Sequence, residues 1–221
     1  MTVKSIAGKK RQKKKKKALL LFHIVAIFGG YYFFSWQAVI VCVVTWYVTQ
    51  KCVGICFHRL LAHRSFKTSK GLEYTMTAIA NLALQKGPIS WTQMHRGHHA
   101  DTDGPNDPHS PRERGLWWAQ IGWMLYENPN IERSVLNKYA QDLERDEVHK
   151  WMNKYWWASS VVLAIIFFCA GWITDGFFYG IALVVYGTFV STVVGWHFTW
   201  LVNSVAHKRK LGYRNFKELK D

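Results

Sequence analysis

The chain has 221 residues, of which 49% are hydrophobic, and its 29 Lys and Arg against 14 Asp and Glu give a formal net charge of +15. The apolar residues come in long blocks, which excludes an ordinary soluble domain with a short apolar period. The polybasic run Lys9–Lys17 lies directly before an apolar block, so we interpret it as a topology determinant at anionic lipid headgroups and expect no nucleic-acid partner.

Two blocks that are almost free of charge, residues 18–57 and 155–200, are each about twice the roughly 20 residues that one membrane-crossing helix needs. Each block predicts a helical hairpin, with turns at Gly29–Trp36 and Thr174–Phe177. All 29 Lys and Arg residues lie outside these turns. The positive-inside rule then places both termini and residues 58–154 on the cytoplasmic side.

The predicted fold is therefore an all-α, multi-pass integral membrane protein with four transmembrane helices in two hairpins and a cytosolic helical cap. In chain order, we expect a polybasic cytosolic tail, a first transmembrane hairpin, a cytosolic or interfacial cap, a second transmembrane hairpin and a cytosolic segment. Their expected bounds are 1–17, 18–57, 58–154, 155–200 and 201–221. The cysteines lie within or at the edge of the apolar spans without metal-binding spacing, and we expect them to be packing residues: Cys42, Cys52, Cys56 and Cys169.

The first two spans lead to a histidine pair. His23 lies early in the first span, near the interface, and we leave it outside the candidate site. The second span, about 37–57, continues directly into His58 and His63. Five residues along an α-helix correspond to a net rotation of about 140°, so the two rings would not face one ion. Either the helix breaks between them or they serve different centres.

A moderately apolar helix is expected over residues 72–90, buried or interfacial, ending at Gly87-Pro88 before a second histidine cluster. In that cluster His95, His98 and His99 stand at positions i, i+3 and i+4, which share one face of a helix. Their ring nitrogens can then converge on one centre. Neutral imidazole suits iron, zinc, copper and nickel, so the cluster predicts a metal site.

Residues 101–112 are rich in Pro, Gly and Asp and predict an irregular loop, whose carboxylates either accept hydrogen bonds from ligand imidazoles or are simply solvated. Residues 116–127 predict an aromatic amphipathic stretch at the interface, and residues 130–154 a cytosolic helix. At the end of the second hairpin Asn203 and His207 share a helix face at the cytoplasmic exit. His197 lies deeper and is expected to be a packing residue.

These motifs resemble the membrane-bound fatty acyl desaturases of the delta-9 type over about residues 18–216. His58-Arg-Leu-Leu-Ala-His63-Arg-Ser resembles their first histidine box and His95-Arg-Gly-His98-His99 their second. The segment Thr199-Trp-Leu-Val-Asn203-Ser-Val-Ala-His207 resembles the part that supplies a further ligand. Three other stretches are also similar to common family segments: Gln85–Trp91, Asp107-Pro-His-Ser and Gly115–Trp123.

The resemblance implies four spans, a cytosolic cap and a centre of two Fe²⁺ ions held mainly by histidine, in which zinc could substitute as an artefact. Asn203 matches a residue that reaches the metal through water, and no catalytic side chain is implied beyond the metal centre. The matching iron ligands are His58, His63, His95, His98, His99 and His207. The matching residues of the substrate tunnel are Gln85, Trp91, Thr199 and Trp200.

The function that the resemblance implies is fatty acyl desaturation, in which dioxygen and two electrons convert a saturated acyl chain to a cis alkene. The expected partners are the lipid bilayer, an acyl chain carried as a CoA thioester or on a lipid, and an electron donor similar to cytochrome b5 or ferredoxin. A basic surface would favour an acidic donor. Two alternatives are a fatty-acid or alkane hydroxylase and a non-catalytic, truncated desaturase-like membrane protein.

The family has a third histidine box beyond the segment that ends at His207, and the sequence ends at Asp221 before any such box. We therefore expect the 221-residue chain to be a fragment or truncated relative that is not competent for desaturation by itself. If it were active, His109, His149 or His197 would have to substitute for the third box. The acyl carrier, the bond oxidised and the choice between a bacterial inner membrane and an endoplasmic reticulum stay open.

Overall fold

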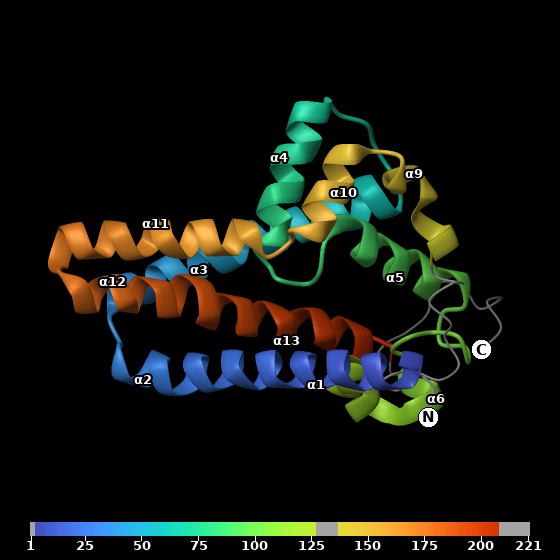
Figure 1. The fold of residues 1–221 in the computed structure, drawn as a ribbon, viewed down its shortest axis with the longest axis horizontal. Helices are drawn as coiled ribbons and strands as arrows, with labels where there is room; N and C mark the ends of the chain where they lie inside the picture. The colour runs from blue at the N-terminus through green and yellow to red at the C-terminus, as the bar shows by residue number, and fades with distance from the viewer. Residues whose placement is uncertain (1–2, 127–136, 208–221) are drawn as a thin grey trace.

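The computed structural model describes residues 3–126 and 137–207, which form helices and turns without a strand (Figure 1). The all-α prediction is confirmed for these residues. Three of their helices are long and apolar enough to cross a membrane: Trp36–Ala62, Ala158–Asp175 and Phe177–Ser204. Figure 1 shows the long helices running along the long axis of the molecule, with the shorter helices α4, α5, α9 and α10 gathered toward one end.

The first helix runs through α1 (Val3–Ile24), the π-helix η1 (Val25–Gly29) and α2 (Gly30–Tyr32). The first predicted span lies on it, but only residues 18–32 are both apolar and helical. At 1.5 Å per residue this part is about 22 Å long, against the roughly 30 Å of a hydrocarbon layer. A fourth span therefore stays a prediction.

The second helix is longer than the sequence indicates. The side chain of Ser35 caps its start by accepting a hydrogen bond from the Ala38 amide at 3.1 Å. The helix then continues through α3 (Trp36–Cys52) and the π-helix η2 (Val53–Ala62) as one rod of 27 residues. The span predicted to end near residue 57 thus extends five residues further.

The single helix predicted over residues 72–90 is wrong. The chain forms α4 (Lys70–Asn81) and, after an irregular connection, α5 (Pro88–Ala100). Leu84 and Lys86 in the connection have positive φ angles of 51° and 80°, which a right-handed helix cannot contain. Pro88 does not end a helix but begins one, at the position where a missing amide hydrogen costs nothing.

The predicted loop is confirmed over residues 101–110, before α6 (Pro111–Trp117), η3 (Trp118–Gly122) and α7 (Trp123–Leu125). The aromatic stretch in these helices is packed against protein as well as exposed, because Trp118 is buried and its Nε1 donates to Pro108 O at 3.2 Å. Part of the helix predicted over 130–154 lies outside the described residues. The described part is three short helices: η4 (Lys138–Ala140), α9 (Gln141–Glu144) and α10 (Glu147–Lys154).

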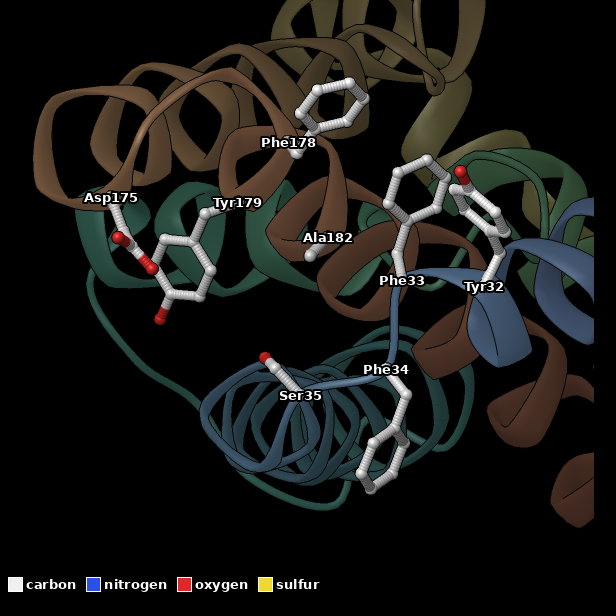
Figure 2. Close-up of a pocket in the computed structure, with 8 residues that line it drawn as sticks. All are labelled: Tyr32, Phe33, Phe34, Ser35, Asp175, Phe178, Tyr179 and Ala182. Carbon is white, nitrogen blue, oxygen red and sulfur yellow. The ribbon is translucent and has the colours of Figure 1, made fainter.

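The second hairpin is formed by α11 (Ala158–Asp175) and the continuous rod of α12 (Phe177–Val184), η5 (Val185–Val190) and α13 (Ser191–Ser204). The turn falls within the predicted stretch, at Gly176, whose φ of 86° favours glycine. Beside this turn lies a cavity of about 460 Å³ between the two hairpins. Figure 2 shows Asp175 and Tyr179 on one side of the cavity and Tyr32 and Phe33 on the other.

The cavity is far from the predicted metal ligands, because it lies at the end of the long helices opposite α5 (Figure 1).

Two hydrophobic cores lie at different parts of the molecule. One core packs residues of α3 against α12 and η5, including Cys42 and Tyr186. The other packs η2 against α4, α5 and α9, including Phe57 and Leu143. The first two histidine motifs lie on elements of the second core, η2 and α5.

Candidate metal centre

Four histidines bring their ring nitrogens together, and we call them the first histidine group: His58 on η2, His63 directly after η2, and His95 and His99 on α5. The Nε2 atom of His63 lies 3.1 Å from that of His58 and 3.0 Å from that of His95. The Nε2 atom of His99 lies 3.1 Å from that of His95. These four residues are all predicted ligands.

The π winding of η2 explains how His58 and His63 meet. The His63 amide donates a hydrogen bond to His58 O at 2.9 Å, which is the i→i+5 pattern of a π-helix. A side chain five residues further along therefore stands about one turn above the first. α-Helical spacing left two alternatives, a break in the helix or separate centres. Neither is needed, because the π winding supplies the missing rotation and both rings lie in one group.

A second histidine group adjoins the first and consists of His98, Asp107, His109 and His207. His98 Nδ1 donates to Asp107 Oδ2 at 2.8 Å, and the His98 ring lies 4.5 Å from the His109 ring and 5.1 Å from the His207 ring, centroid to centroid. His207 Nδ1 donates to Asp103 Oδ1 at 3.1 Å. The structure thus separates His98 from its neighbours in the sequence motif, with the His98 and His99 rings 5.2 Å apart at the boundary.

Several rings in these groups are held neutral. Burial, followed by the neighbouring histidines, lowers the pKa of His95 to about 2 and that of His99 to about 4. Burial also lowers the pKa of His109 to about 3, although the Asp107 carboxylate acts in the opposite direction. A histidine must be neutral to bind a metal ion through its lone pair. The electrostatics of both groups therefore suit metal binding near neutral pH.

The donor atoms also fit a metal ion. In the first group four Nε2 atoms face one another, so when each ring carries its proton on Nδ1 the four lone pairs converge and can bind a cation. In the second group Asp107 fixes the proton of His98 on Nδ1, which leaves Nε2 free as a ligand. Asp107 itself is fully buried and also accepts from the amides of Asp103 and His109.

Arg96 connects the two helices that carry the first group. Its guanidinium donates to Leu61 O at 2.6 Å and to Ala62 O at 2.9 Å, the last carbonyls of η2, and it also binds Asp142 at 2.7 Å. Arg64 pairs with the same carboxylate. Burial alone would raise the pKa of Asp142, but hydrogen bonds from Arg96 and Arg64 lower it to about 2. The carboxylate is therefore charged throughout the physiological range.

Three of the four residues predicted to line the substrate tunnel lie in contact. Gln85 Nε2 donates to Thr199 Oγ1 at 2.8 Å, and Trp91 Nε1 donates to Gln85 Oε1 at 3.4 Å. The Trp91 ring also stacks on the His95 ring at 4.8 Å, which joins this cluster to the first histidine group. Trp200 is buried and stacks on Trp196 at 6.0 Å. Their contact with a substrate stays a prediction.

The remaining histidines near the spans pair with each other. His23 Nε2 lies 3.1 Å from His197 Nε2, and His23 Nδ1 donates to Leu19 O at 2.7 Å. His197 packs its edge against Trp200 at 5.0 Å. This arrangement agrees with the packing role expected for His197. Asn203 is half-buried on the last turn of α13, one turn before His207.

Sequence reasoning did not assign roles to three of the residues that hold this region together. Arg96 stands between two histidines of a box, and an arginine at that position could have indicated a structural acceptor on another helix. Gln50 is a polar residue in an apolar block, and its Oε1 accepts from Thr199 Oγ1 at 3.3 Å. His109 was considered only as a substitute ligand, yet its ring is the nearest to His98 in the second group.

The comparisons with known proteins agree on one family. A family model described as fatty acid desaturase matches residues 34–219. The chain is 37% identical over 184 residues to the sn-1 stearoyl-lipid 9-desaturase of Anabaena variabilis and 38% identical over 186 residues to the sn-2 palmitoyl-lipid 9-desaturase of Nostoc sp. (strain 36). Each match covers 82% of this chain.

A more distant relative differs in its named substrate. The chain is 34% identical over 175 residues, or 79% of its length, to the acyl-CoA C20 Delta5-desaturase of Anemone leveillei. The chain spans 62%, 61% and 53% of the lengths of these three relatives.

Proposed function

Because this chain belongs to the fatty acid desaturase family, we propose that it carries the metal-binding core of an oxidoreductase that converts a saturated acyl chain to a cis alkene. The observation that carries the proposal is the meeting of two adjoining histidine groups beside one end of membrane-length helices. The alternative function, a hydroxylase that uses related histidine boxes, is distinguished by the product analysis described below.

The proposed metal is a pair of iron ions. Neutral imidazole suits iron, and the proposed ligands are the six predicted histidines, with Asn203 acting through water. When bound, such a centre supplies the oxidising power that removes two hydrogens from an unactivated acyl chain with dioxygen and two electrons. His109 is added to the proposal as a seventh histidine, because its neutral, buried ring lies beside His98.

The protein itself would position the acyl chain and hold the ligands. The hydrogen-bonded set of Gln85, Thr199 and Trp91 gives a fixed wall next to His95, because each polar atom in it already has a partner. A wall without unpaired polar groups suits an apolar chain. Asp107 keeps the His98 proton on Nδ1, so that the Nε2 lone pair stays directed away from the carboxylate.

The proposed setting is a membrane with the histidine groups on its cytoplasmic side. A fourth span over residues 18–35, the cytosolic cap and both cytoplasmic termini complete this topology, and the run of lysines before residue 18 supports it through the positive-inside rule. An acidic electron donor similar to cytochrome b5 or ferredoxin would meet this basic side. The acyl carrier to test first is a membrane lipid, because the relatives at 37% and 38% identity are named lipid desaturases.

The test is to express the chain, by itself and extended through any downstream histidine cluster, in a host that makes only saturated acyl chains, and to analyse the lipids of that host by mass spectrometry. The extended form is expected to give a cis alkene and its His95→Ala variant is not, whereas its His23→Ala variant, which changes a histidine outside both groups, should keep activity. The 221-residue chain by itself is expected to give no alkene. Iron content should fall in His95→Ala alone. An alcohol without an alkene would assign the protein to the hydroxylases. The absence of both products, from the iron-loaded extended form supplied with an electron donor, would refute the proposal.

A further inference from the structure

A third polar cluster lies between α4 and α10 and shares no residue with either histidine group. It consists of Glu73 on α4, Asp146 at the start of α10 and His149 on α10. Figure 1 shows α4 and α10 side by side. One nitrogen of His149 and one oxygen of each carboxylate all lie within 4.8 Å of one another.

His149 is the unusual member of this cluster. Its side chain is fully buried, and neither ring nitrogen makes a hydrogen bond to the described residues. Both nitrogens nevertheless face carboxylates, with Nδ1 at 3.3 Å from Asp146 Oδ2 and Nε2 at 3.5 Å from Glu73 Oε1. A buried polar group without a hydrogen bond costs about 1–3 kcal/mol, so its position needs a compensating partner.

Lys70 marks the point where the carboxylates converge. Its ammonium nitrogen lies 2.8 Å from Glu73 Oε1 and 3.0 Å from Asp146 Oδ2. The hydrogen bond to Glu73 contributes most to raising the pKa of Lys70. The side chain of Lys70 is 62% exposed, so water screens these ion pairs, and its flexible stem can carry the charge into solvent. The position of this ammonium group is therefore open to exchange with another cation.

We propose that Glu73, Asp146 and His149 form a binding site for a divalent metal ion of the zinc type, which replaces the Lys70 ammonium group. One imidazole and two carboxylates are ligands that zinc accepts, at about 2.0–2.2 Å, with water in the remaining position. Two atoms bound to one ion at these distances are at most about 4 Å apart. The donor atoms are close to this spacing already, so small side-chain rotations are enough to close the site.

The site would tie α4 to α10, and α10 contacts the start of α5, the helix that carries the second histidine motif. Asp146 also caps α10, because its Oδ1 accepts from the amides of Val148 and His149. Further along α10, Asn153 Oδ1 accepts from the Ser90 amide at 2.9 Å in the first turn of α5. A metal ion that ties α4 to α10 would thus stiffen the support on which α5 begins.

The test measures zinc binding to the purified full chain in detergent at pH 7.5, for the wild type, His149→Gln and Lys70→Met. The two histidine groups are intact in all three proteins, so differences between them report on this cluster. We expect the wild type to bind one zinc ion more per chain than His149→Gln. Lys70→Met should bind that ion at least about tenfold more tightly, because it lacks the competing charge. Zinc should also raise the melting temperature of Lys70→Met more than that of the wild type.

The matched control is Lys150→Met on α10, the helix that carries His149. It removes an exposed lysine that pairs with Glu147 and not with the cluster. It should bind zinc like the wild type. Equal zinc content in the wild type and His149→Gln would overturn the proposal. If His149→Gln does not fold, the comparison of Lys70→Met with the wild type decides alone, and unchanged or weaker zinc affinity in Lys70→Met would overturn the proposal.

Discussion

Arg96 illustrates how much of the candidate centre depends on one side chain between two ligands. A lysine keeps the charge but cannot reach the carbonyls of Leu61 and Ala62 and the Asp142 carboxylate at once. We expect Arg96→Lys to lose about 1.5–3 kcal/mol of stability, and iron binding should weaken because His63 is no longer fixed beside His95. Thermal unfolding and iron analysis test this expectation. Arg59→Lys, an exposed arginine on η2, is the control and should behave like the wild type.

The ion pair between Arg96 and Asp142 should depend on pH through the Asp142 carboxyl group. Its pKa is about 2 in the folded protein and 3.8 in an unperturbed aspartate, so the unfolded chain binds the proton first. The contribution of the carboxylate is therefore complete above about pH 5 and is lost as the pH falls toward 2. The difference in melting temperature between the wild type and Asp142→Asn should be largest near pH 6 and shrink toward pH 3. A difference that grows on acidification would contradict the assignment.

Asp107 is expected to control metal affinity without touching the metal. In Asp107→Asn an amide replaces a buried carboxylate that accepts from His98 and from two backbone amides, so at least one donor loses its partner. Loss of such an orienting carboxylate costs about 10- to 100-fold in metal affinity. Equilibrium dialysis with Zn²⁺ measures the effect. Asp101→Asn, in the same loop, should keep the wild-type affinity.

At the scale of single elements, α11 and α12 depend on two glycines that let their backbones touch. A Cβ atom on Gly180 would lie 2.7 Å from Phe168 O, and one on Gly171 would lie 2.7 Å from the Gly180 Cα. Neither neighbour is a flexible side chain that can move aside. We expect Gly180→Ala to lose about 1–3 kcal/mol, measured as a lower melting temperature in detergent.

Gly54 provides the comparison for this substitution, because a Cβ atom there meets no atom within 4 Å. Gly54→Ala should leave the melting temperature unchanged or raise it, since alanine favours a helix more than glycine does. If both alanine variants melt at the same temperature, the close contact between α11 and α12 does not limit stability.

The elements also show what the sequence could and could not predict. Apolar blocks and the turn at Gly176 follow from composition and residue type, so two apolar helices joined by a turn within residues 174–177 could be predicted. The π winding of η2 was not predicted, because an apolar run has the same composition in an α-helix and in a π-helix. Only the five-residue spacing of His58 and His63 pointed to it. Likewise, the positive φ angles at Leu84 and Lys86 belong to residue types that rarely adopt them.

The division of the histidines into two groups could not be predicted from spacing either. His95, His98 and His99 share a helix face, and only the loop that carries Asp107 decides that His98 turns to the second group. The sequence could place the ligands at one end of the molecule, because each motif follows or precedes an apolar block. Which ligand faces which depends on tertiary contacts between residues more than 30 positions apart, such as His63 and His95.

At the scale of the whole molecule, orientation across the membrane is the main prediction to test. A cysteine at Ser65, just beyond the histidine end of η2, should react with an impermeant maleimide only from the cytoplasmic side. A cysteine at Asp175, in the turn at the opposite end, should react only from the other side. The wild type, with its native cysteines, measures the background. Labelling of both cysteines from one side would refute the predicted topology.

Because the helices of the second hairpin differ in length, the height of Thr199 above the hydrocarbon layer depends on bilayer thickness. From the turn at Gly176, α11 runs back for 18 residues, while the rod from Phe177 to Ser204 runs for 28, or about 27 Å against about 42 Å. A hydrocarbon layer that α11 just crosses leaves the last part of the rod, with Thr199, standing above it. Natural bilayers differ by about 5 Å, roughly one helical turn. If Thr199 lines an acyl tunnel as proposed, an acyl chain anchored by its headgroup would meet Thr199 at a different carbon in a thicker membrane.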